Sequence, residues 1–203
     1  MSVLLRLDTS PRQGASVSRE LADAAEAKWL REHPEGTVIR RDLAGEPIEH
    51  IRAITIQGFY TPEEQVTSDL KAATKLSDEL IAELNGADTL LISTPIYNFS
   101  VPSSLKAWID QVTRIGVTFG FEPDKGLFGL AKTEKAIVVA ALGLPYAGTP
   151  LQNMDFLRPY LVGWLNFMGI EEVEVIAAEN TSADADVAQR SKQVALDQLG
   201  VAA

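Results

Sequence analysis

The sequence contains no cysteine and only two histidines, His33 and His50. The absence of cysteine excludes disulfides, thiolate catalysis and cysteine metal centres. Neither histidine stands at helical spacing from another plausible ligand, so the sequence predicts no metal site. A structural role is the favoured interpretation for both, and no catalytic acid–base side chain is predicted.

Basic residues and long apolar runs are also scarce. Lys and Arg number 18 against 28 Asp and Glu, which gives a net charge of -10 and disfavours nucleic acid or an anionic membrane as a partner. No stretch approaches the roughly 18 apolar residues that a membrane span needs. The chain meets charge at Arg6, too early for a secretory signal. We therefore expect a soluble, cytoplasmic protein.

Short apolar runs alternate with segments of helical periodicity. Continuous apolar runs are typical of parallel strands that helices cover on both faces. They predict strands at residues 3–7, 37–41, 89–93, 136–141 and 173–177, of which 37–41 is the most polar and suits a sheet edge. Apolar residues recur about once per helical turn at residues 17–29, 70–84, 105–115, 156–168 and, more weakly, 184–199.

This alternation predicts an α/β fold. Right-handed crossovers then give a doubly wound parallel five-stranded sheet, with order 2-1-3-4-5 and helices on both faces. The chain shows no repeat and no convincing linker, so residues 1–203 are expected to form a single domain. The irregular segment 44–62 is long for a compact domain, which favours a functional or interfacial role.

The loop after the first strand carries several hydroxyls. In such a sheet, ligands bind outside the carboxyl ends of the strands. Ser10, Ser16 and Ser18 share one strand-to-helix turn, where a helix N-terminus suits a phosphate and Arg12 adds charge. The alternative is that Ser16 or Ser18 merely caps the helix. The cluster of hydroxyls favours the phosphate, and the absence of GxGxxG and of GxxxxGK[ST] argues against a Rossmann loop or a P-loop.

Two further loops follow the third and fourth strands. Tyr97, Asn98 and Phe99 place two aromatics and an amide at a strand end, as a flavin ring would require. The alternative, that Tyr97 and Phe99 cap the core, weighs equally on spacing alone. The loop at 141–148 is punctuated by glycine and proline, and it is expected either to touch a ring edge or to line a substrate pocket. Tyr146 is the predicted substrate-binding residue of this loop.

At these loops the chain resembles the FMN-dependent NADH-azoreductase (NADH:quinone oxidoreductase) family, whose fold is flavodoxin-like. The resemblance runs over nearly the whole chain. It is strongest in Pro-Ile-Tyr-Asn-Phe at 95–99, Leu-Lys-Ala-Trp-Ile-Asp at 105–110 and Gly-Val-Thr-Phe at 116–119. Further matching pieces are the hydroxyl turn at 16–18, Thr-Pro-Glu-Glu at 61–64 and Phe-Met-Gly-Ile at 167–170.

The resemblance assigns site residues. It implies that the FMN phosphate is held by Ser10, Ser16, Val17 and Ser18. It implies that the ribityl chain and the isoalloxazine ring are held by Ile96, Tyr97, Asn98 and Phe99. A further family segment, usually Ser-Arg-Gly-Gly, touches the ring after the fourth strand, and its positions here read Ala141, Leu142, Gly143 and Leu144. This departure removes a hydroxyl and a guanidinium, so backbone contacts are expected there. Phe121 is implied to be an aromatic beside the active site.

The activity implied is hydride transfer from NADH or NADPH through bound FMN to quinones or azo compounds, in a ping-pong cycle. Such transfer requires no acid–base side chain. The family is typically homodimeric, with the flavin near the interface. Two alternatives stay open. One is a flavodoxin-type one-electron carrier. The net negative charge of the chain fits such a carrier, but the first loop lacks the Thr-rich phosphate turn expected of flavodoxins. The other is a flavin-less binding relative, which the altered segment 141–144 would permit.

Overall fold

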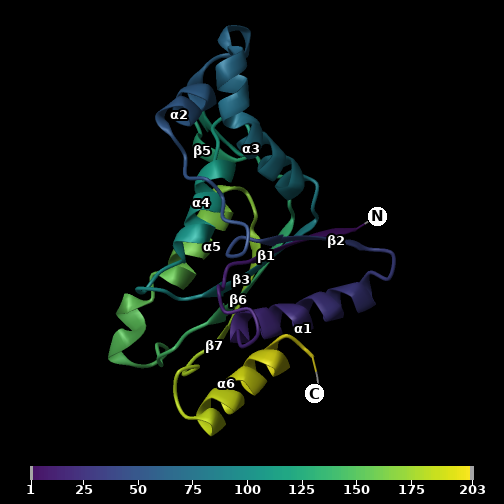
Figure 1. Ribbon diagram of the computed structural model, residues 1–203, viewed down its shortest axis with the longest axis vertical. Helices are drawn as coiled ribbons and strands as arrows, with labels where there is room; N and C mark the ends of the chain where they lie inside the picture. The colour runs from purple at the N-terminus through teal and green to yellow at the C-terminus, as the bar shows by residue number, and fades with distance from the viewer. Residues whose placement is uncertain (1, 202–203) are drawn as a thin grey trace.

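A parallel sheet of five strands forms the centre of the molecule (Figure 1). The computed structural model describes residues 2–201. The sheet has the order β2-β1-β3-β6-β7, which numbered among these five strands alone is the predicted 2-1-3-4-5. Its strands are β1 (Val3–Asp8), β2 (Thr37–Asp42), β3 (Thr89–Pro95), β6 (Lys135–Ala141) and β7 (Glu172–Ala178). The flavodoxin-like topology is therefore confirmed, with the polar strand β2 at one edge as expected.

Helices cover both faces of this sheet. Helices α1 (Val17–Glu32) and α6 (Ala185–Gln198) lie on one face, and α3 (Ser68–Asn85), α4 (Ser103–Val112) and α5 (Leu157–Phe167) lie on the other (Figure 1). The short 3₁₀ helices are η1 (Glu63–Gln65) and η2 (Pro150–Met154). Every periodic segment of the sequence thus forms a helix, because each presents one apolar stripe to the sheet.

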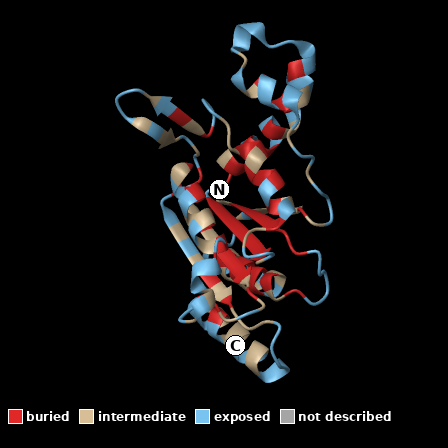
Figure 2. Cartoon of the chain, turned by 90° about the vertical axis from the view of Figure 1, so that its left-hand side faces the viewer, coloured by how far each residue is buried: buried red, intermediate tan, exposed pale blue. Residues whose placement is uncertain are grey.

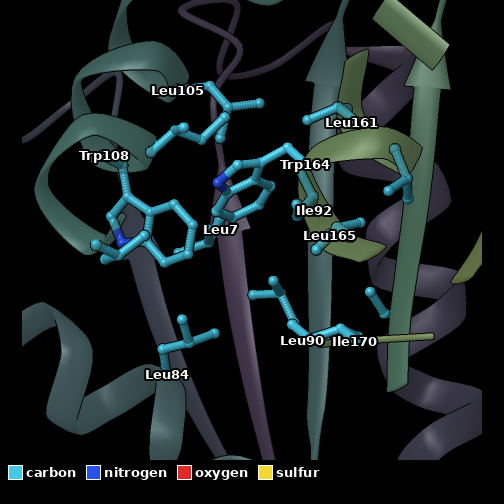
Figure 3. Close-up of a cluster of buried hydrophobic side chains, with 14 of the residues drawn as sticks. Leu7, Leu84, Leu90, Ile92, Leu105, Trp108, Leu161, Trp164, Leu165 and Ile170 are labelled. Carbon is cyan, nitrogen blue, oxygen red and sulfur yellow. The ribbon is translucent and has the colours of Figure 1, made fainter. Parts of the chain in front are cut away.

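The strands divide their side chains between two cores. On β3, Leu90 and Ile92 point into the larger core with Trp108 of α4 and Trp164 of α5 (Figure 3). Leu91, between them, belongs to the core beneath α1. The two indole rings meet edge to face, with their centroids 5.8 Å apart. Alternation along each strand fixes the register of the sheet, because a slip by one residue would exchange the two faces.

Two elements are absent from the sequence prediction. The segment 44–62 contains helix α2 (Ala53–Tyr60), and an antiparallel ribbon of β4 (Phe119–Glu122) and β5 (Gly126–Gly129) follows α4. Both project from the body and carry many exposed residues (Figure 2). Gly58 lets α2 approach α3, since a β-carbon there would lie 2.5 Å from Cγ2 of Thr74. Among residues 2–201, no helix has the length and apolarity to cross a membrane.

Candidate functional site

A cavity of about 390 Å³ opens at the carboxyl ends of the strands. Such a volume lies in the range of small-molecule and cofactor sites. The loops after β1, β3, β6 and β7 all contribute to its walls. Its lining residues are Ser10, Arg12, Ala15, Ser16, Val17, Pro95, Ile96, Tyr97, Ala141, Gly143, Thr181 and Ser182.

The first wall is the N-terminus of α1. Ser16 is the N-cap residue, and its hydroxyl accepts a hydrogen bond from the amide of Arg19 and lies 3.2 Å from the hydroxyl of Ser18. Amides in the first turn of a helix have no partner within the helix, and the dipole there favours negative charge. Ser16 therefore caps the helix and also borders the cavity, so the two interpretations of this residue are compatible. Ser18 is fully buried behind it and does not line the cavity.

Arg19 stabilises this turn through hydrogen bonds to its backbone. Its guanidinium donates to the carbonyl oxygen of Ser10 from Nε at 3.1 Å and from Nη2 at 2.8 Å, and to Asp42 at the end of β2 at 2.6 Å. Burial alone would raise the pKa of the Asp42 carboxyl, but the bonds from Arg19 and from the Gly45 amide outweigh it and the pKa lies below its ordinary value. Arg19 is thus occupied, whereas exposed Arg12 has no ion-pair partner among residues 2–201.

The second wall is a tight turn after β3. Tyr97 and Ser100 exchange backbone hydrogen bonds of 2.9 and 3.0 Å, and the two residues between them, Asn98 and Phe99, have φ of +47° and +69°. Two successive positive φ angles are the mark of a two-residue type I′ turn. The side chains of Tyr97 and Phe99 are more than a third exposed and belong to neither core. This exposure favours a role at the surface of the loop over capping of the core.

Ile96 and Tyr97 line the cavity itself, while Asn98 lines a second hollow that shares Tyr97 with it. Phe99 is connected differently. Its carbonyl oxygen accepts a hydrogen bond of 3.0 Å from the amide of Phe156, which ties the turn to the start of α5. Two sets of backbone hydrogen bonds therefore fix the turn: the pair between Tyr97 and Ser100, and the bond from Phe156 to Phe99.

The third wall follows β6, where the predicted residues point in different directions. Ala141 and Gly143 line the cavity. Leu142 is fully buried in the larger core, so only its backbone faces the loop, and Leu144 is half exposed outside the cavity. Tyr146 is also buried in the core, and this burial raises the pKa of its phenol. The Leu142 side chain could contact a ligand in the cavity only if the core opened.

Phe121 lies away from this cavity. It stands on β4 with 59% of its surface exposed. The ribbon that carries it packs through Gly129 against Met168 and Gly169, in the turn that leads into the amino end of β7. The cavity lies at the opposite, carboxyl edge of the sheet. Phe121 therefore does not line the cavity of its own chain.

Thr181 and Ser182, from the loop after β7, are cavity residues that the sequence reasoning missed. A polar Asn-Thr-Ser run directly after an apolar strand is a signal that could have found them.

Glu179 holds the β6 loop in place. Its carboxylate accepts hydrogen bonds from the amides of Tyr146 at 2.6 Å and Ala147 at 3.0 Å, and it pairs with Arg158 of α5. Partial burial would raise the pKa of this carboxyl. The bonds from Arg158 and the two amides outweigh that effect and leave the pKa below its ordinary value.

Replacing Glu179 with glutamine should therefore lower stability at neutral pH by about 1 kcal/mol, since the charge-assisted bonds are weakened. A carboxyl with a lowered folded-state pKa stabilises the fold above its ordinary pKa of 4.5, and this contribution is lost as pH falls toward the folded-state value. Urea denaturation across this acid range should show the wild-type advantage shrinking to nothing. A constant difference at every pH would contradict this role.

A larger cavity of about 450 Å³ lies at the amino ends of the strands, beside Trp29 and His33. Helix α1 ends there, so the negative end of its dipole disfavours an anion. Lys135 and Glu172, which both line this cavity, form an ion pair of 2.6 Å and neutralise each other. Within residues 2–201 no cluster of three or more metal-ligating side chains occurs. The cavity at the carboxyl edge is therefore the candidate site.

The donors of that site suit a phosphorylated, flat ligand. One end offers the hydroxyls of Ser10 and Ser16 with the amides of α1, which suit a phosphate. The walls between are apolar or small, from Ile96 and Ala141 to Gly143, where a β-carbon would fill space next to Ser182. The aromatic Tyr97 also borders the cavity. A flavin mononucleotide has this combination of parts.

Comparisons with known proteins agree with this geometry. A family model described as a flavodoxin-like fold matches residues 2–201. The FMN-dependent NADH:quinone oxidoreductase of Xanthobacter autotrophicus is 48% identical over 177 residues, covering 86% of this chain and 85% of that protein. The protein of the same name from Azotobacter vinelandii is 41% identical over 199 residues, covering 98% of both chains.

Solved structures share the fold. A crystal structure of azoreductase from Bacillus anthracis superposes with a TM-score of 0.89 at 24% identity, covering 98% of this chain and 97% of that chain. An FMN-dependent NADH-azoreductase from Bacillus anthracis in complex with FMN gives a TM-score of 0.82 at 22% identity, covering 98% of both chains.

Proposed function

Because this chain belongs to the FMN-dependent NADH:quinone oxidoreductases of flavodoxin-like fold, we propose that it transfers electrons from NADH through FMN to quinones or azo compounds. The observation that carries this proposal is the cavity at the carboxyl edge of the sheet. There the N-terminus of α1 and the Tyr97–Ser100 turn border one continuous space. A phosphate and a flat ring can be bound together only where two such loops converge.

The chain's own residues bind and orient the cofactor. Ser10, Ser16 and the amide of Val17 would hold the phosphate, with Ser18 supporting Ser16 from below. The segment from Ile96 to Phe99 would hold the ribityl chain and one side of the ring. The segment from Ala141 to Leu144 would meet the ring mostly through its backbone, since Leu142 is in the core and Leu144 points out of the cavity.

Bound FMN supplies the redox chemistry, since its ring accepts a hydride and passes two electrons on. Among residues 2–201, no side chain that lines the cavity is a histidine or a carboxylate. The protein's part is therefore to position the ring and to leave one side of it open. NADH or NADPH and the acceptor would use the same open side in turn, which predicts ping-pong kinetics. Acceptor protons would come from water.

A homodimer would complete the site. Tyr60 of α2, Phe121 of β4 and Leu127 of β5 are 68%, 59% and 60% exposed, an unusual exposure for large apolar side chains. They lie on the two elements that project from the body (Figure 2). In such a dimer, Phe121 would border the cavity of the second copy. Tyr146, which is buried in the core of its own chain, would support the substrate pocket from beneath. Sedimentation of the purified protein as a monomer would contradict this arrangement. We place this dimer in the cytoplasm.

Anaerobic titration with NADH tests the proposed function. The purified protein should bind FMN, and NADH should bleach the flavin absorbance without a separate reductase. Steady-state rates with a quinone should give parallel double-reciprocal lines, and NADPH in place of NADH measures the preference between the two. A flavin that NADH leaves oxidised would indicate a one-electron carrier. A protein that refuses added FMN would indicate a flavin-less binding relative.

A further inference from the structure

A fourth loop, residues 179–184 after β7, borders the proposed flavin cavity. It is fastened to the β6 loop by backbone hydrogen bonds, from the amide of Thr181 to the carbonyl of Leu142 at 3.0 Å and from that of Ser182 to Gly143 at 3.2 Å. Asn180 turns the chain with φ of +58° so that Thr181 and Ser182 follow the β6 loop closely. The loop is therefore positioned by the same segment that is expected to meet the ring.

The loop carries two hydroxyls, on Thr181 and Ser182. Among residues 2–201, neither the Thr181 nor the Ser182 hydroxyl forms a hydrogen bond, although both residues line the cavity. The Ser182 oxygen lies 2.8 Å from the position that a β-carbon on Gly143 would take. The Ser182 hydroxyl thus stands beside the wall that Gly143 leaves open, and Thr181 lines the same cavity one residue earlier.

The β6 loop supplies no side-chain donor at this wall. Ala141 is apolar, Gly143 has no side chain, Leu142 is buried and Leu144 points out of the cavity. The polar edge of a flavin ring carries several acceptors and a donor, and buried polar groups need hydrogen-bond partners. If the ring lies against this wall, its edge faces only backbone groups and the two hydroxyls.

We propose that Thr181 and Ser182 are cofactor-binding residues whose hydroxyls bond the polar edge of the flavin ring. They replace the side-chain contacts that the segment 141–144 does not provide. The proposal rests on the proposed function, since it presumes that FMN occupies the cavity. The ring rather than the phosphate is assigned because Ser182 adjoins Gly143, while the phosphate end has its own donors at Ser10 and Ser16.

The test removes each hydroxyl and compares two flavins. Thr181→Val, Ser182→Ala and the double variant are titrated with FMN and with riboflavin, which lacks the phosphate, by quenching of flavin fluorescence. Each single change should weaken FMN binding about threefold to tenfold and the double change about 30-fold, as expected for lost hydrogen bonds. Riboflavin binding should weaken by the same factors, because both flavins share the ring.

Three controls separate the outcomes. Thr181→Ser keeps a hydroxyl and should bind FMN within about twofold of wild type. Adding Ala141→Ser to the double variant should restore affinity in part, because it returns a hydroxyl to this wall. Thermal unfolding of the apo-proteins should be unchanged, since the backbone bonds of the loop remain.

The proposal is overturned if the double variant binds both flavins as wild type does, or if it loses FMN affinity while riboflavin affinity is kept. A parallel loss of apo-protein stability would also overturn it, because the loop's fold would then account for the effect. Failure of the wild-type protein to bind FMN would instead refute the proposed function.

Discussion

Replacing Ser16 with aspartate is expected to weaken FMN binding roughly 100-fold while the fold stays intact. Aspartate is as good an N-cap as serine, so helix α1 should still begin at Val17. Its carboxylate, however, would face the phosphate from the wall of the cavity. Two unit charges about 4 Å apart repel by about 4 kcal/mol at an effective dielectric constant near 20, and solvent screening reduces this to roughly the stated loss.

Ser16→Asn is the matched control, since asparagine caps a helix equally well and adds no charge. It should bind FMN within about tenfold of wild type. Riboflavin affinity should be similar in all three proteins, and the defect of the aspartate variant should shrink at high salt. Equal FMN affinities for the aspartate and asparagine variants would show that the phosphate does not sit at this helix terminus.

Gly129→Ala should cause a large loss of folding stability, about 3 kcal/mol or more. A β-carbon at this position would lie 2.1 Å from the backbone nitrogen of Gly169 and 2.3 Å from the carbonyl carbon of Met168. Both are main-chain atoms, which cannot rotate away as a side chain can. The ribbon would have to separate from the turn before β7, which would also strain the nearby bond from the Ala131 amide to the Met168 carbonyl.

Gly163→Ala provides the contrast for this prediction. Gly163 is an exposed residue of α5, and apart from the adjoining chain of its own helix no atom of residues 2–201 lies within 4 Å of the position that its β-carbon would take. Alanine there should stabilise the protein by about 0.5–1 kcal/mol, because glycine loses more conformational entropy in a helix. Urea denaturation measures both variants. Similar stabilities for the two would mean that the close approach at Gly129 relaxes without cost.

The sheet and its helices were predictable because their pattern is governed by burial. Leu90, Leu91 and Ile92 form a continuous apolar run only because both faces of β3 are covered. Helix α2 was not predictable in the same way. Its eight residues lack an amphipathic stripe and include Gly58, whose role depends on Thr74 of another helix. The β4–β5 ribbon likewise depends on the approach of Gly129 to Gly169, which no local pattern reveals.

The sequence predicted the site residues that a single loop brings together. It did not predict the contributions that depend on side-chain orientation or on the packing of distant loops. Hydroxyls at a strand-to-helix turn identified Ser10 and Ser16. The family motif gave the position of Leu142 but not its orientation, which strand alternation decides: Val138 and Ala140 face the larger core, and Leu142 continues their row. Thr181 joins the cavity only through a crossover from β6 to β7, so its contribution required the assembled sheet.

The positive φ of Asn98 and Phe99 has a consequence for the protein as a whole. At Phe99 this conformation is less stable than it would be for glycine by about 1 kcal/mol or more, whereas asparagine tolerates it well at Asn98. A turn selected only for folding would carry glycine after Asn98. This chain keeps an aromatic ring at that position instead, beside the residue that lines the hollow next to its cavity. The most stable sequence of this turn and its actual sequence therefore differ at Phe99.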